Sequence, residues 1–156
     1  ERIRQELEKL ICYCMEKESI TEEDVAVICS EQTENKIFDM INAMAEKKQK
    51  KAMELYYDLL ALKEPPMRIL YLITRQFNLL MQVKELSEEG YSAKTISERL
   101  KMAGFIVRNC LRQAEYFSLK TLKEALQDCV RMEEAVKTGR MNDVMSVELL
   151  LVKYSS

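Results

Sequence analysis

The two prolines of this chain, Pro65 and Pro66, stand next to each other between two apolar segments. Proline lacks a backbone N–H and clashes inside a helix, but it fits in a helix's first turn. One helix should therefore end near Leu62 or Lys63, and the next should run from the prolines to about Glu88. Apolar residues cover well over half of the circumference of this second helix: Met67, Ile69, Leu70, Leu72, Ile73, Phe77, Leu79, Leu80, Met81 and Val83. A helix of this kind is buried on several sides, so we predict that it is the central rod of a helical bundle.

The composition favours an all-α protein. The 156 residues include only 3 Gly and 2 Pro, and 32% of the residues are charged. Few turn residues together with many Leu, Ala, Glu and Lys are typical of helical chains. This length suits one domain, or one domain with a fragment of another. The formal net charge of −2 indicates neither a tail that binds polyanions nor an acidic tail.

The sequence gives no sign of a membrane segment or a leader. No apolar run reaches the roughly 18 residues that a membrane-spanning helix needs, and residues 1–4 read ERIR, without the apolar core of a signal peptide. We therefore expect a cytoplasmic location and no membrane partner. The first residue is not Met and a helical pattern is already under way, so we also expect a piece of a longer protein.

A polar stretch suggests a domain boundary near the start of the chain. Thr21 is followed three residues later by Asp24, the pattern of a helix N-cap, and a short helix should follow it. The polar residues Ser30–Asn35 then predict a linker. We accordingly divide the chain into residues 1–33 and residues 34–156.

Capping residues mark the later helices. Ser92, Ser118 and either Asn142 or Asp143 are expected to cap three helix starts. Glycine readily adopts the left-handed conformation found after helix ends. Gly90 should therefore end the central helix, and Gly139 should close the helix that begins after Ser118.

Catalytic, metal and cofactor sites are not indicated. The chain has no His, and its five cysteines include no C-x-x-C pair, which a zinc site without His would need. The nucleophile-elbow, phosphate-loop and dinucleotide-binding glycine motifs are also absent from the sequence. We predict no catalytic residue, no metal and no cofactor in this piece, and buried reduced thiols at the cysteines.

The segment Ser92–Phe117 has the outline of a helix-turn-helix, with a turn at residues 102–104. If its second helix packs through Val107, Cys110, Leu111 and Ala114, four residues suited to reading base edges would face outward: Arg108, Asn109, Arg112 and Gln113. The segment has five basic and two acidic residues, a modest excess for a DNA reader. Ordinary packing explains the same pattern, so nucleic-acid binding is kept as an alternative. A Met-lined groove for a partner helix is a third possibility.

Seven segments, taken in order, resemble the C-terminal part of the bacterial DNA polymerase III delta subunit family. They are ITEEDV at 20–25, NKIFDMINA at 35–43, LLAL to the prolines at 59–66, RQF and LLMQVKEL within 75–86, YS to Leu100 at 91–100, LRQA at 111–114 and KTGR at 137–140. No single segment is diagnostic, but the ordered set is specific and covers nearly the whole chain.

The resemblance implies a fold and a role. Residues up to about Cys29 would end the small helical lid domain that follows a RecA-like AAA+ module. Residues from about Glu34 onward would form a helical collar domain, which in this family packs with the collars of sister subunits, tau/gamma and delta-prime, into a ring. This collar would be a scaffold in DNA replication. The sliding clamp would be bound and opened by an N-terminal module not present here, and DNA would be reached only through the DNA polymerase III complex.

Overall fold

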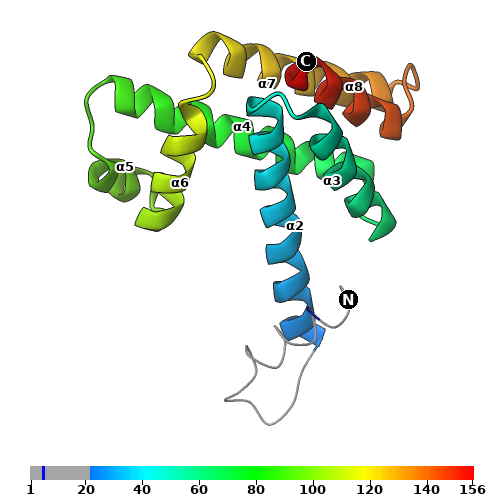
Figure 1. The fold of residues 1–156 in the computed structure, drawn as a ribbon, viewed down its shortest axis with the longest axis horizontal. Helices are drawn as coiled ribbons and strands as arrows, with labels where there is room; N and C mark the ends of the chain where they lie inside the picture. Colours follow the sequence, from blue (N-terminus) through cyan, green and yellow to red (C-terminus); the bar gives the residue numbers. More distant parts are fainter. Residues whose placement is uncertain (1–4, 6–21) are drawn as a thin grey trace. The chain divides into compact units, whose positions relative to one another are not determined.

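The computed structural model describes residue 5 and residues 22–156. That part of the chain is built from helices joined by short turns and contains no strand, which confirms the predicted all-α class (Figure 1). The helices are α2 (Glu22–Ala45), α3 (Gln49–Ala61), α4 (Pro66–Glu88), α5 (Ala93–Leu100), α6 (Gly104–Ala114), α7 (Leu119–Lys137) and α8 (Asp143–Ser155). None of the described helices is both long and apolar enough to span a membrane.

The prolines place the central helix as predicted. Pro65 is the N-cap of α4 and Pro66 its first residue. Seven α4 side chains are buried: Ile69, Leu70, Leu72, Ile73, Phe77, Leu80 and Val83. α4 packs against α5, α6, α7 and α8, so it is the central rod of the bundle.

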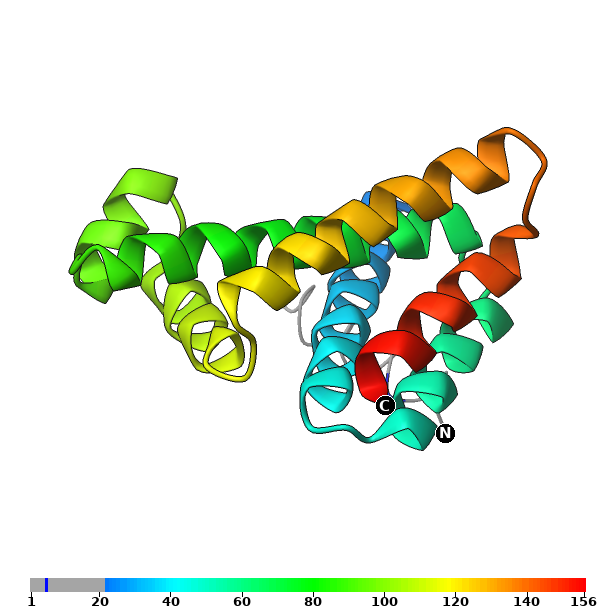
Figure 2. The same ribbon diagram turned by 90° about the horizontal axis from the view of Figure 1, so that it is seen from above.

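The other helices gather along and at the two ends of α4 (Figures 1 and 2). α7 lies alongside α4, and α8 packs back on α7 and α3. The short pair α5 and α6 lies near the C-terminal end of α4, whereas α3 and α8 lie near its N-terminal end. These two helix pairs therefore display different surfaces at opposite ends of the rod.

The predicted caps are confirmed in atomic detail. The side chain of Ser92 accepts a hydrogen bond from the Thr95 amide, and that of Ser118 accepts one from the Thr121 amide. Asn142, rather than Asp143, is the N-cap of α8. Such a bond satisfies one of the amides that a helix start leaves without an intrahelical partner.

Gly90 and Gly139 follow the ends of α4 and α7 with φ angles of 96° and 74°. A side chain is disfavoured at such angles, and glycine is not. Both glycines therefore end their helices as predicted.

The prediction of a linker at Ser30–Asn35 is wrong as regards local structure. α2 continues through that segment without a break, because it contains neither Pro nor Gly and its polar residues are compatible with a helix. The structure divides into two compact units, Glu1–Lys36 and Ile37–Ser156. The helical pattern at the start of the chain and the predicted cap at Thr21 lie outside the described residues.

The turn between α5 and α6 differs from the expected one. Gly104 is the first residue of α6, and Lys101 is the residue in the left-handed conformation, with φ 53° and ψ 46°. Ala103 has extended backbone angles and precedes the helix as its N-cap. The turn therefore bends at a lysine rather than at the glycine.

Candidate functional site

The four candidate base-reading residues lie on α6, but they do not share one surface. Arg108 and Arg112 are exposed, and Asn109 is partly exposed. Gln113 is only 2% exposed, so the prediction that it faces outward is wrong. The buried face of α6 consists of Val107, Cys110, Gln113 and Ala114, so α6 presents three of the four candidates outward.

Gln113 is held at the junction of three helices. Its side-chain oxygen accepts a hydrogen bond from Gln76 Nε2 of α4 at 2.9 Å. Its Nε2 donates to the Phe38 carbonyl at 3.0 Å and to Asn42 Oδ1 at 2.8 Å, both in α2. A buried amide is stable only when such partners are present, so Gln113 links α6 to α4 and α2.

The exposed part of the α6 candidate site is also partly engaged within the chain. Arg112 donates to Asn109 Oδ1 at 2.8 Å. The Arg108 guanidinium lies close to Gly104. If Gly104 had a Cβ atom, that atom would be 3.3 Å from Arg108 Nη1. α6 is further fixed to α4 by Lys84, whose ammonium donates to the Ala114 carbonyl at 3.2 Å.

A shallow hollow of about 200 Å³ lies between α2 and α6 beside the Gln113 junction. Its lining is mixed aromatic and polar: Phe38, Asn42, Glu46, Asn109, Arg112, Gln113 and Tyr116. Because Gln113 and Asn42 bond to each other at its wall, the hollow adjoins a structural junction. It also gives water a way to the edge of that junction.

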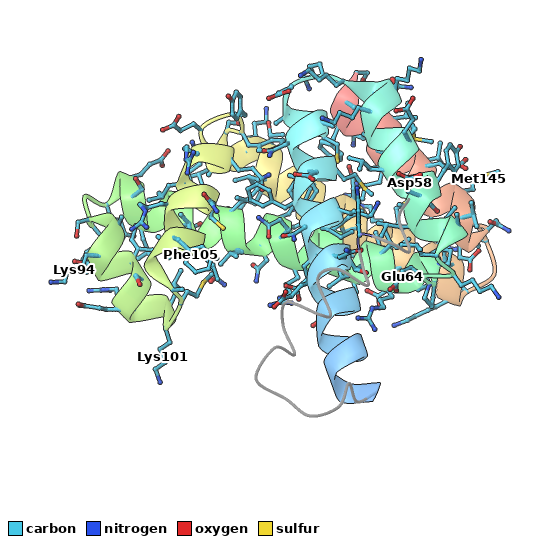
Figure 3. All side chains as sticks on the ribbon, turned by 60° about the horizontal axis from the view of Figure 1, so that its bottom comes forward. Asp58, Glu64, Lys94, Lys101, Phe105 and Met145 are labelled. Carbon is cyan, nitrogen blue, oxygen red and sulfur yellow. The ribbon has the colours of Figure 1, made fainter. Side chains whose placement is uncertain are left out.

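The exposed charges near the α5–α6 turn are mostly basic: Lys94, Arg99, Lys101 and Arg108, against Glu98. Lys94, Lys101 and Phe105 project there, far from Asp58, Glu64 and Met145 at the other end of the bundle (Figure 3). Phe105 is exposed. Arg99 is engaged within the chain, because its guanidinium stacks 4.1 Å from the centre of the Tyr91 ring, in the turn between α4 and α5.

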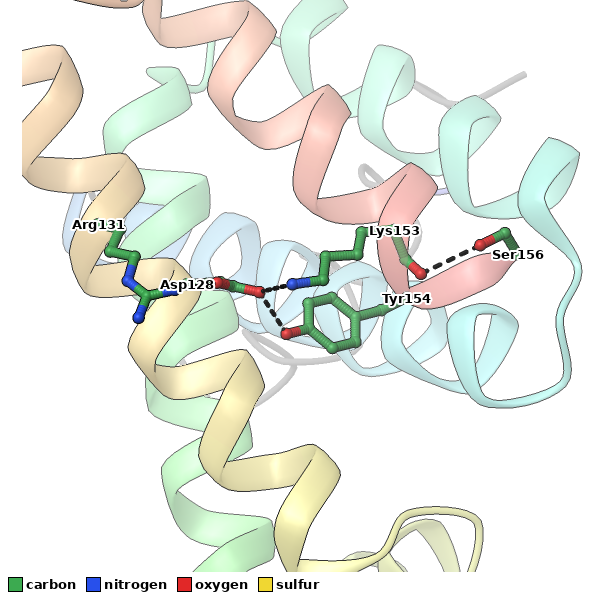
Figure 4. A network of polar contacts seen from close by, with 5 residues as sticks. All are labelled: Asp128, Arg131, Lys153, Tyr154 and Ser156. Atoms are coloured by element: carbon green, nitrogen blue, oxygen red, sulfur yellow. Dashed lines mark hydrogen bonds and ion pairs between the residues drawn. The ribbon is translucent and has the colours of Figure 1, made fainter.

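Asp128 is the clearest buried charge among the described residues, and it ties α7 to α8 (Figure 4). Its Oδ2 accepts hydrogen bonds from Lys153 Nζ and from the Tyr154 hydroxyl, each at 2.5 Å. Arg131 lies 3.4 Å from Oδ1. Burial acts to raise the pKa of this carboxyl, but the hydrogen bonds from Lys153 and Tyr154, together with the charges of Lys153 and Arg131, outweigh burial and hold the pKa below its usual range. The cluster has the character of a structural clamp.

Cys110 and Cys129 are free and buried. Burial raises the pKa of the Cys129 thiol to about 11 and also raises that of Cys110. Thiols that stay protonated are poor nucleophiles. The prediction of buried reduced thiols is thus confirmed for these two, whereas the side chains of Cys12, Cys14 and Cys29 are outside the described part.

Sequence reasoning missed a second apolar face on α8. Its buried face includes Val147, Leu150, Leu151 and Tyr154. Three further apolar side chains of the same helix are exposed: Met145 (52%), Leu149 (44%) and Val152 (38%). Their spacing of four and three residues aligns them in one row along the helix. The same spacing is visible in the sequence and could have revealed this row.

α4 exposes little apolar surface. Of its large apolar side chains only Tyr71 is exposed; the others are buried or, at Met67, Leu79, Met81 and Leu86, partly buried against the surrounding helices. Three exposed apolar side chains lie together on α8, at the end of the bundle where α3 packs.

Comparison with known proteins agrees with this architecture. The family described as "DNA polymerase III delta subunit, C-terminal domain" matches residues 34–154. The DNA polymerase III subunit delta of Bacillus subtilis is 34% identical over 151 residues, which are 97% of this chain and 44% of that protein.

A solved structure is similar over the same extent. The Bacillus subtilis DNA clamp loader delta protein superposes with a TM-score of 0.79 at 33% identity, covering 97% of this chain and 44% of that one. This chain thus spans less than half the length of the relatives that it matches. From residue 34 to residue 154, it belongs to the family formed by the C-terminal domains of DNA polymerase III delta subunits.

Proposed function

We propose that this chain is the collar-forming part of a clamp-loader delta subunit and acts in DNA replication as a scaffold. The observation that carries the proposal is the family match over residues 34–154. It is supported by the similar fold of the Bacillus subtilis DNA clamp loader delta protein. In this role residues 34–156 form the collar, and residues 1–33 are the end of the preceding lid domain.

The physical character of the bundle suits a scaffold. α4 is buried by four other helices, and the junctions at Gln113 and Asp128 fix neighbouring helices through buried hydrogen bonds. Polar networks that are fully satisfied favour one packing arrangement. A bundle of this kind holds its surface residues in constant relative positions, which a ring-forming domain requires.

The proposed partners are the tau/gamma and delta-prime subunits, which would contact the chain through their own collars. The collar would fix delta in the ring so that its clamp-opening module, which lies in another part of the delta polypeptide, is held where the ATP-driven subunits can expose it. The sliding clamp and DNA would be contacted by the assembled complex rather than by this chain alone.

The test is a pull-down of purified tau/gamma and delta-prime from the same bacterium by the immobilised chain, without ATP. Capture should be stable, because collar contacts do not depend on nucleotide. The control is the chain unfolded and refolded, with its helicity checked by circular dichroism. A chain with full helicity that captures neither protein would contradict the proposal.

The helix-turn-helix alternative predicts a different result. It requires duplex DNA binding that weakens steeply with salt, since phosphate contacts release counterions. The variant Arg108→Ala/Arg112→Ala should then lose binding, because both guanidiniums lie on the outward side of α6. If wild type and variant bind duplex equally, or neither binds, the alternative is rejected.

A further inference from the structure

α8 is apolar on two sides. One side packs into the core, and the other carries Met145, Leu149 and Val152, which we call the α8 stripe. Exposed apolar side chains scattered singly are ordinary on a protein surface, but a continuous row on a helix whose other side is already buried is not. A surface helix normally carries one apolar face, which packs on the core, and polar residues elsewhere. The α8 stripe therefore has the character of a contact surface.

Two polar edges frame the α8 stripe. On the side of α3, Glu148 accepts a hydrogen bond from the Tyr57 hydroxyl at 3.1 Å, and the Tyr57 ring remains exposed. On the side of α7, Lys153 is already paired with Asp128. Glu148 is thus the acidic group at the edge of the stripe, whereas the basic group at the opposite edge is neutralised within the chain.

This arrangement disfavours a second copy of the chain as the occupant. If two α8 helices packed antiparallel across a two-fold axis, each edge would meet the same edge of its partner. Glu148 lies next to Leu149, near the middle of the α8 stripe, so the two Glu148 carboxylates would come together in a setting that excludes water. Like charges placed together across an interface oppose association. A partner with a different sequence could place a basic group there instead.

We propose that the α8 stripe, together with the Tyr57 ring, is the docking surface for an amphipathic helix of another clamp-loader protein. The docking helix carries apolar residues spaced three and four apart and a Lys or Arg side chain that meets Glu148. The inference rests on the proposed function and deepens it, because it assigns the contact between subunits to one face of the bundle.

The test uses the complete natural protein that contains this chain, mixed with the tau/gamma and delta-prime subunits. Leu149→Asp places a charge in the centre of the α8 stripe, and Glu148→Lys reverses the charge at its edge. Two matched controls separate these effects from general damage. Val130→Asp makes the same kind of change on α7, at a side chain that is also exposed. Val130 points away from α8, because it lies two residues, or about 200° around the helix, from Asp128, which faces α8. Tyr57→Phe removes the hydrogen bond to Glu148 but keeps its charge.

We expect Leu149→Asp to weaken binding to the partner proteins at least about tenfold, the loss typical of a central interface residue. Glu148→Lys should also weaken binding, and the loss should shrink as salt is raised, because repulsion between the two basic groups is screened. Val130→Asp and Tyr57→Phe should bind within about twofold of wild type. Thermal unfolding of each variant shows whether the bundle is intact; if Leu149→Asp is unfolded, Glu148→Lys decides.

Three results would overturn the inference. Wild-type binding with Leu149→Asp and Glu148→Lys unaffected would reject the α8 stripe while leaving the proposed function intact. Absence of wild-type binding would reject the proposed function, and this inference with it. A homodimer in light scattering that Leu149→Asp dissociates would show that a second copy covers the stripe.

Discussion

Replacing Gln113 by leucine should destabilise the bundle without touching its surface. Leucine fills a similar volume but can make none of the three hydrogen bonds that Gln113 makes to Gln76, the Phe38 carbonyl and Asn42. Each such bond contributes about 1 kcal/mol net, and leaving a partner unsatisfied costs about 1–3 kcal/mol. The adjoining hollow admits water to part of the site, which offsets some of this cost. We therefore expect a loss of about 2–3 kcal/mol, a large share of a typical domain's total of about 5–15 kcal/mol.

The assay is urea unfolding followed by circular dichroism at about 222 nm, with the free energy of unfolding extrapolated to water. Arg112→Ala is the control, since Arg112 lies on the outward side of the same helix and donates its hydrogen bond to neighbouring Asn109; it should change the free energy by at most about 0.5 kcal/mol. A Gln113→Leu variant within about 0.5 kcal/mol of wild type would refute the assignment of Gln113 to a structural junction.

Three further predictions concern stability. Phe77→Ala should lower the free energy of unfolding by about 3–5 kcal/mol. Phe77 is fully buried, and its ring meets the Phe117 ring edge-on, with 5.8 Å between the ring centroids. The same truncation at exposed Tyr71 should cost under about 1 kcal/mol by urea unfolding. Ser118→Ala should cost about 1 kcal/mol by removing the α7 cap, seen as a lower urea midpoint. The Asp128 carboxylate, whose pKa is lowered in the fold, should stabilise the bundle fully above its unfolded pKa of about 3.9 and progressively less as the pH falls through the folded pKa. The stability difference between wild type and Asp128→Asn should therefore shrink below about pH 4; a difference independent of pH would contradict it.

The central part of the fold could be predicted because its signals are local. The prolines at 65 and 66 fix the start of α4 through their missing N–H groups. Ser92 and Ser118 cap the helices that follow them through bonds three residues along the chain. Such interactions need no knowledge of which helices meet in space, so the sequence alone predicts where these helices begin.

The errors arise where packing between distant segments decides the outcome. Gln113 is polar, but its partners in α2 lie more than 70 residues away, so its burial cannot be inferred from α6 alone. Lys101 adopts the left-handed conformation although a glycine stands three residues later. The continuity of α2 through Ser30–Asn35 is a different kind of error, because polarity alone does not interrupt a helix in a segment without a helix breaker.

The candidate site is predicted least well. The sequence draws attention to the basic residues of α6, since a turn between two short helices resembles a known DNA-binding outline. The row of Met145, Leu149 and Val152 escapes notice because Val147, Leu150 and Leu151 already give α8 a sufficient buried face. Both rows have helical spacing, and the packing of α8 against α3, α4 and α7 decides which one is covered.

The central claim is that this chain takes its place in a clamp loader through its helical bundle. The most direct measurement is size-exclusion chromatography with light scattering of the folded chain mixed with tau/gamma and delta-prime, in the absence of ATP and DNA. The account predicts a complex whose mass includes one copy of the chain. Elution of the chain alone as a folded species, at protein concentrations that assemble the complete loader, would contradict the account.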